Sequence, residues 1–163
     1  MTKKIYFASP LFSNMEFEYN ARIVAKIREY YPNLDIYLPQ EQVDINDKNS
    51  YADSTMIAKA DTDALLSSDL LIAVLDGISI DAGVASEIGV AYQAGLPILG
   101  LYTDSRQQGA NNKQKLEAIG NLGESQFSYV NLYTVGLCKL AGELVDNEST
   151  MIEKIGEVLE LNS

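Results

Sequence analysis

Hydrophobic positions along the chain follow two alternating patterns. Short, nearly continuous apolar runs are typical of strands covered on both faces. They predict strands at Ile5–Ala8, Leu34–Leu38, Leu70–Leu75, Pro97–Tyr102 and Glu143–Asp146. Apolar residues three or four positions apart are typical of amphipathic helices. They predict helices at Asn14–Tyr30, Tyr51–Ser67, Asp81–Ala94, Lys113–Ile119, Leu132–Leu140 and Met151–Leu161. Polar residues predict loops at 39–50 and 104–112, and residues 126–130 are expected to be irregular.

Strands that alternate with helices favour a parallel sheet, because parallel neighbours need crossover connections. We therefore predict a single α/β domain over residues 1–163, with a doubly wound, five-stranded parallel sheet in the flavodoxin-like order 2-1-3-4-5. This order places the topological switch between the first and third strands, and ligands bind beyond the carboxyl ends of the strands at such a switch. Residues 8–12, with Ser9 among them, and residues 76–87 are therefore expected to form the binding site.

Composition and charge narrow the classes of function. The 163 residues include 12 Lys and Arg against 23 Asp and Glu, a net charge of −11 that disfavours nucleic-acid and anionic-membrane partners. No apolar run approaches the ~20 residues of a membrane span, and the first apolar stretch is too short for a secretory signal. The single cysteine, Cys138, fits a reducing compartment, so a cytoplasmic protein is expected. The absence of histidine removes Ser-His-Asp and Cys-His catalysis and most zinc sites.

Two predicted helices carry a carboxylate on their apolar side. Glu87 lies within the apolar arc of helix 81–94, and Asp61 lies on the apolar stripe of helix 51–67. Such a carboxylate is costly unless it is partnered or lines a cleft. A capping or packing role explains Glu87 equally well, whereas Asp61 has no capping role in mid-helix. Asp81 fits an N-cap, which is compatible with a second, functional role. Clustered carboxylates without softer ligands indicate glycosyl chemistry, with Mg²⁺ binding as the alternative.

At these positions the sequence resembles the nucleoside 2-deoxyribosyltransferase family. The resemblance runs from Ile5 to about Leu161, and its most specific piece is the pattern D-x-G-x-x-x-E-[IL]-G from Asp81 to Gly89. It implies the transfer of 2-deoxyribose between nucleobases by double displacement through a covalent glycosyl-glutamate. The implied partners are a small-molecule deoxynucleoside and a free nucleobase, and the reaction needs no cofactor and no metal.

The resemblance also implies roles for individual residues. Glu87 matches the nucleophile that attacks C1′ of the sugar, and Asp61 matches the acid that protonates the departing base. Tyr6 matches the residue that orients the nucleophile. Asp81 would hold the primary hydroxyl of the sugar, and Phe12 would stack against the base.

Further matches concern the base and the assembly. Gln42, together with Gln40, falls where some family members recognise the edge of the base. Asn131 matches a residue donated to the site of a neighbouring subunit, which implies a homo-oligomer, either a dimer or a larger assembly. Tyr133 stands where some members have a methionine, a difference that bears on sugar and base preference.

Other interpretations share parts of this pattern. An N-glycosidase would use the same residues with water as the acceptor. The related hydrolases of deoxynucleoside monophosphates carry serine where Asp81 stands and a basic, glycine-rich loop after the first strand, which residues 9–14 lack. The Asp81 carboxylate would also repel a 5′-phosphate, so nucleosides are expected as substrates. A receiver-like signalling domain would need an acidic pair at the end of the first strand, and a flavodoxin would need a phosphate loop there. A non-catalytic nucleoside-binding domain would have little use for Glu87.

Overall fold

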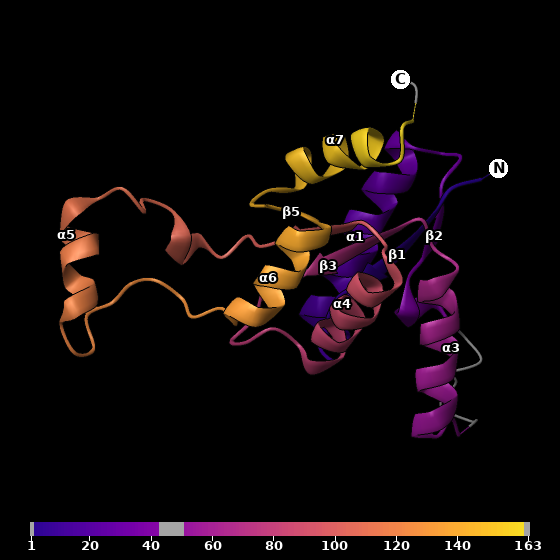
Figure 1. The fold of residues 1–163 in the computed structure, drawn as a ribbon, viewed down its shortest axis with the longest axis horizontal. Coiled ribbons are helices and arrows are strands. Elements are labelled where there is room, and N and C mark those ends of the chain that lie inside the picture. Colours follow the sequence, from indigo (N-terminus) through magenta and orange to yellow (C-terminus); the bar gives the residue numbers. More distant parts are fainter. Residues whose placement is uncertain (1, 43–50, 162–163) are drawn as a thin grey trace.

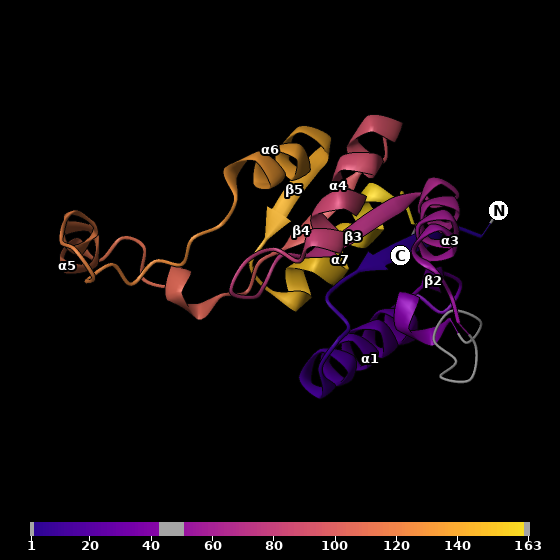
Figure 2. The same cartoon turned by 90° about the horizontal axis from the view of Figure 1, so that it is seen from below.

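The computed structural model describes residues 2–42 and 51–161, so residues 43–50 of the predicted loop 39–50 lie outside it. Its centre is a five-stranded parallel sheet in the order β2-β1-β3-β4-β5, which confirms the predicted doubly wound fold (Figures 1 and 2). The strands are β1 (Lys4–Ala8), β2 (Asp35–Tyr37), β3 (Leu70–Val74), β4 (Ile98–Leu101) and β5 (Gly142–Val145). The helices are α1 (Asn14–Tyr30), α3 (Ser54–Leu66), α4 (Ala82–Ala94), α5 (Lys113–Glu117), α6 (Leu132–Ala141) and α7 (Glu148–Val158). No helix in this part of the chain is long and apolar enough to cross a lipid bilayer.

Helices cover both faces of the sheet, and alternate residues of β1 contact different layers. Ile5 and Phe7 pack with α1 and α7 on one face. Tyr6 and Ala8 point to the other face, where they pack with α3, α4 and α6. Because successive side chains of a strand point to opposite faces, the hydroxyl of Tyr6 reaches the layer that contains α4. The buried aromatic ring thus brings a polar atom next to this helix.

The helix boundaries follow their capping residues. The predicted start of helix 51–67 is wrong by three residues, because the Asp53 side chain accepts a hydrogen bond from the backbone N–H of Met56 and α3 begins at Ser54. The last helix begins at Glu148, since Asn147 is its N-cap, and it ends at Val158 rather than at Leu161. The predicted ends of helix 81–94 are confirmed within one residue, and Gly95 terminates α4 in the left-handed conformation that glycine adopts readily.

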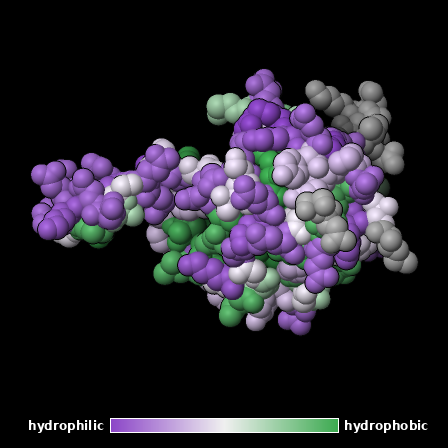
Figure 3. Space-filling model, turned by 90° about the horizontal axis from the view of Figure 1, so that it is seen from above, coloured by the Kyte–Doolittle hydropathy of each residue, from purple (hydrophilic) through white to green (hydrophobic). Residues whose placement is uncertain are grey.

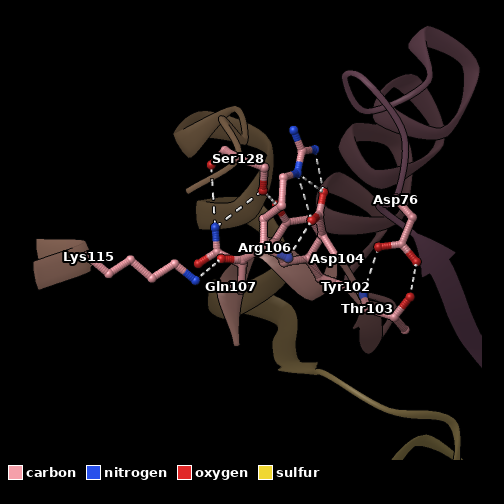
Figure 4. Close-up of polar contacts among 8 residues, drawn as sticks. All are labelled: Asp76, Tyr102, Thr103, Asp104, Arg106, Gln107, Lys115 and Ser128. Carbon is pink, nitrogen blue, oxygen red and sulfur yellow. Dashed lines mark hydrogen bonds and ion pairs between the residues drawn. The ribbon is translucent and has the colours of Figure 1, made fainter. Parts of the chain in front are cut away.

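Residues 104–131 form an arm that extends away from the body and carries α5 near its tip (Figures 1 and 2). The predicted loop 104–112 is correct in part, because the 3₁₀ turn Ser105–Gln107 lies within it. Gln107 Nε2 donates to Ser128 Oγ at 3.3 Å, so the outgoing and returning segments of the arm meet at its root (Figure 4).

Asp76, at the end of β3, fixes the chain just before the arm. Its carboxylate accepts hydrogen bonds from the backbone N–H of Thr103 at 2.7 Å and from Thr103 Oγ1 at 2.6 Å (Figure 4). An Asp-Gly pair is typical of a turn. In the structure the Asp76 carboxylate also joins the segments that follow β3 and β4.

Candidate active site

A cavity of about 330 Å³ lies at the predicted switch point, beyond the carboxyl end of β1 and beside the first turns of α4. Residues from four segments far apart in the sequence line it: Ser9, Leu11, Phe12, Pro39, Ile57, Asp61, Asp81, Gly83, Val84 and Glu87. A larger and more open hollow, about 1070 Å³, lies elsewhere, beside Lys3 and Tyr30. We place the candidate active site in the smaller cavity, because it contains the carboxylates that the sequence singles out.

Glu87 lies on the second turn of α4, between the buried residues Val84 and Ile88 of the same helix. Its Oε1 accepts a hydrogen bond of 2.6 Å from the hydroxyl of Tyr6, which is fully buried. Burial raises the pKa of Glu87 to about 7; the Tyr6 hydrogen bond opposes this rise, and the charges of Asp61 and Asp81 add to it. A carboxyl group that changes its charge near neutral pH is suited to act first as a nucleophile and later as a leaving group.

Asp61 reaches the same cavity from α3. Its Oδ1 accepts a hydrogen bond of 3.1 Å from the hydroxyl of Tyr37, at the end of β2. Burial raises the pKa of Asp61 above its ordinary value, and the Tyr37 hydrogen bond acts in the opposite direction. Each of the two site carboxylates, Glu87 and Asp61, therefore has its own tyrosine donor.

Tyr37 is the site residue that sequence reasoning missed. The feature that would identify Tyr37 is its position at the end of β2, where the parallel register pairs it with Tyr6 on β1. The register could not be read from the sequence, so Tyr37 stood out only as one aromatic residue among ten tyrosines.

Asp81 combines a structural role with a place in the cavity. Its Oδ2 accepts from the backbone N–H groups of Gly83 at 2.9 Å and Val84 at 3.1 Å, which confirms the N-cap interpretation. Both bonds use the same oxygen, so Oδ1 can still accept a hydrogen bond from a ligand. A Cβ atom at position 83 would lie 3.0 Å from Asp81 Oδ2, so the glycine in this motif leaves room for the cap.

Two further predicted binding residues line the cavity. Ser9 is buried at the end of β1, and its hydroxyl faces the carbonyl of Pro10. Phe12 stands at the rim, with 78% of its surface exposed. An exposed aromatic ring at the edge of a cavity is suited to stack on a planar ligand.

The remaining predicted residues do not line this cavity. Gln42 donates from Nε2 to the carbonyl of Leu38 at 3.2 Å. Gln40 accepts a hydrogen bond from the buried Asn20 and donates to the carbonyl of Phe17. Asn131 ends the arm, where its Oδ1 accepts from the backbone N–H of Thr134 as the N-cap of α6.

Metal binding was the competing interpretation of the clustered acids. Within residues 2–42 and 51–161, no group of three or more Cys, Asp or Glu side chains is arranged so that it could hold a metal ion. Glu87 and Asp61 each accept a hydrogen bond from a tyrosine, and Asp81 caps α4, an arrangement that favours acid–base and nucleophilic chemistry.

Known proteins resemble this chain in sequence and in fold. The family model for nucleoside 2-deoxyribosyltransferase matches residues 5–153. No curated protein sequence matches the chain significantly. Among solved structures, a conserved protein from Enterococcus faecalis V583 is 58% identical, with 96% of this chain and 99% of that chain covered and a TM-score of 0.91.

Two more distant structures share the fold. The 2-deoxyribosyltransferase from Leishmania mexicana is 21% identical, with 95% of this chain and 97% of that chain covered and a TM-score of 0.64. The CMP N-glycosidase from Clostridium botulinum is 17% identical, with coverages of 95% and 98% and a TM-score of 0.50.

Proposed function

Because the chain belongs to the nucleoside 2-deoxyribosyltransferase family, we propose that it transfers 2-deoxyribose from a deoxynucleoside to a free nucleobase by double displacement. One observation carries the proposal: Glu87 and Asp61 face a single cavity, and a separate tyrosine holds each carboxylate. A paired nucleophile and acid is what this reaction needs.

In the first half of the reaction, Glu87 attacks C1′ of the deoxyribose. Tyr6 donates to Oε1, which leaves Oε2 to form the ester bond as the C1′–N bond breaks. Asp61 gives its proton to the departing base, so the base leaves neutral and Asp61 becomes a carboxylate. The sugar remains on the enzyme as a glycosyl ester of Glu87.

The second half reverses these steps with a new base. Asp61 takes a proton from a ring nitrogen of the incoming base, and that nitrogen attacks C1′. The ester bond breaks, and the electron pair returns to the Glu87 carboxylate. Two inversions at C1′ retain its configuration, and the enzyme ends in its starting protonation state.

The first step requires a proton on Asp61 while Glu87 is ionised. Burial raises the pKa of both carboxyl groups, and two carboxylates in one cavity repel each other, so the pair keeps one proton more readily than two isolated groups would. The Tyr6 hydrogen bond favours the ionised form of Glu87 and so favours the reactive arrangement.

We also propose that the substrates are nucleosides rather than nucleotides. Asp81 Oδ1 can accept a hydrogen bond from the primary hydroxyl of the sugar, whereas the same carboxylate would repel a 5′-phosphate. Hydrolysis is the nearest alternative, since water can replace the second base on the same residues. A CMP N-glycosidase shares the fold, although at 17% identity.

The arm supports an assembly in which the protein pairs with copies of itself. The arm projects from the body and exposes large apolar side chains such as Leu122. Directly after the arm, Leu132 and Tyr133 at the start of α6 are each 77% exposed. Figure 3 shows hydrophobic surface on the body beside the root of the arm. Contiguous exposed apolar surface marks an interaction site, so we propose a homo-oligomer in which Asn131 contributes to a neighbouring site.

A base-exchange assay tests the proposed function. The protein is incubated with thymidine or deoxyinosine plus free adenine, and the products are separated by chromatography, with Glu87→Ala in parallel. Wild type should form deoxyadenosine, and the variant should be slower by roughly three orders of magnitude or more. Free base without deoxyadenosine would show a hydrolase instead, and the absence of any product from purine and pyrimidine donors would refute glycosyl transfer.

A further inference from the structure

A second tyrosine, Tyr37, donates a hydrogen bond to a site carboxylate as Tyr6 does. In the parallel pairing of β1 with β2, Tyr6 and Tyr37 are direct register partners. Their rings are stacked, with centroids 5.1 Å apart and planes inclined by 23°. Because Tyr6 is fully buried, its ring gives Tyr37 a fixed surface to pack on. Strand register therefore stacks two phenol rings whose hydroxyls each reach a carboxylate that lines the cavity.

The two hydroxyls serve different carboxylates. Tyr6 donates to Glu87 at 2.6 Å, and Tyr37 donates to Asp61 Oδ1 at 3.1 Å. Asp61 belongs to α3, whereas Tyr37 belongs to β2 of the sheet. The hydrogen bond from Tyr37 therefore ties Asp61 to the sheet, just as the hydrogen bond from Tyr6 of β1 ties Glu87 to it. Fixing Oδ1 leaves Oδ2 as the oxygen that can carry the proton to the base.

We propose that Tyr37 is the positioning residue of the catalytic acid: its stacked, strand-anchored hydroxyl holds the carboxyl plane of Asp61 so that Oδ2 faces the leaving base. This inference rests on the proposed deoxyribosyl transfer and deepens it. Tyr37 itself exchanges no proton with the substrate. Its contribution is geometric, because proton transfer requires the acid within hydrogen-bond reach and correctly oriented.

The surroundings of Tyr37 keep its hydroxyl protonated, because burial and the charge of Asp61 raise the pKa of the phenol, and they hold its ring in place. The ammonium nitrogen of Lys4 lies 5.6 Å from the centroid of the Tyr37 ring, within the range of a cation–π contact. Lys4 is also held in place, because its Nζ donates to Ser67 Oγ at 2.8 Å. The cation–π contact therefore helps to fix the orientation of the Tyr37 ring. The titratable groups that interact with Asp61 are Tyr37, Tyr6 and Glu87.

The leaving group provides a test that a purely structural role would not pass. A nucleobase departs slowly as an anion and needs the proton of Asp61, whereas 4-nitrophenolate is a stable anion and departs without one. The donors are the best deoxynucleoside from the base-exchange assay and 4-nitrophenyl 2-deoxyriboside. Release is followed in single turnover with the enzyme in excess and no acceptor, so that only the first half of the reaction is observed.

The variants are Tyr37→Phe and a matched control, Tyr31→Phe. Phenylalanine keeps the stacked ring and removes only the hydroxyl. Tyr31 lies on the opposite face of the sheet, where its hydroxyl donates to the carbonyl of Ile152 at 2.9 Å. Tyr37→Phe should slow the release of nucleobase about tenfold and the release of nitrophenolate less than about twofold. Tyr31→Phe should leave both rates unchanged.

Three results would overturn the assignment of Tyr37. Equal slowing of both donors would show a general structural effect. An unchanged rate of nucleobase release would show that Asp61 needs no positioning. If wild type releases base from no deoxynucleoside, the proposed function fails and the inference fails with it. In the first two results wild type is active, so only the assignment of Tyr37 is lost.

Discussion

At the scale of single residues, the proposed chemistry depends on a carboxyl group that lies where its charge is costly. Glu87 sits beside buried apolar residues of α4, and burial raises its pKa to about 7. Above that pH the folded protein holds a poorly solvated carboxylate, a cost that is absent from the unfolded chain. The proposed nucleophile is therefore a group that the fold tolerates at the expense of stability.

This cost predicts the behaviour of Glu87→Gln. Glutamine keeps an acceptor for Tyr6 but carries no charge. At pH 4 both side chains are neutral and the two proteins should be equally stable. As the pH rises from about 4.5 to about 7, the wild type loses stability relative to the variant, because Glu87 ionises in the unfolded chain at a lower pH than in the folded protein. The variant should be more stable above pH 7 by up to about 3 kcal/mol.

Denaturant unfolding at several pH values checks this prediction. The matched control is Glu18→Gln on the exposed surface of α1, which should change stability by less than about 0.5 kcal/mol at every pH. A stability difference for Glu87→Gln that is the same at pH 4 and pH 8 would contradict the prediction.

At the scale of elements, α4 places capping and chemistry within one motif. Asp81 caps the helix through Oδ2, and Glu87 follows on the next turn, facing the same cavity. Asp81→Asn keeps an oxygen that can accept from the backbone, so it should unfold like wild type, whereas Asp81→Ala should lose about 1 kcal/mol. If the carboxylate also holds the sugar, both variants should raise KM; an unchanged KM for Asp81→Asn would contradict that role.

Sequence alone could predict the elements and most of the cavity. Long apolar runs such as Leu70–Leu75 fix buried strands, and a carboxylate such as Asp61 on an apolar stripe is visible in a helical pattern. Tyr37 could not be found in this way, because its meeting with Tyr6 depends on strand register. The start of α3 shifted for a similar reason, because Asp53 acts as its cap through local geometry that composition does not specify.

At the scale of the whole molecule, the arm exposes large apolar side chains, among them Leu122 and Tyr129. Residues 104–131 extend from the body, and Asn131 lies where the arm returns to α6. In a closed dimer such an arm exchanges residues between two equivalent sites. The cavity would then combine Glu87 of one copy with Asn131 of the other.

Mixing two variants tests this assembly. Glu87→Ala and Asn131→Ala should each be impaired alone, but a mixed dimer contains one site with both residues intact. After subunit exchange, an equimolar mixture should recover about a quarter of the wild-type rate. Sedimentation of the wild type provides the control for assembly. Activity no greater than the mean of the two variants would contradict a shared site.

The central claim is that Glu87 carries the sugar during transfer. The most direct measurement is mass spectrometry of the intact protein and its peptides. The protein is incubated with a deoxynucleoside, without added acceptor base, and quenched with acid during the reaction. The account predicts a deoxyribosyl adduct that maps to the peptide containing Glu87, disappears when free base is added before quenching, and never forms in Glu87→Gln. Product formation with no adduct, or an adduct on another residue, would contradict it.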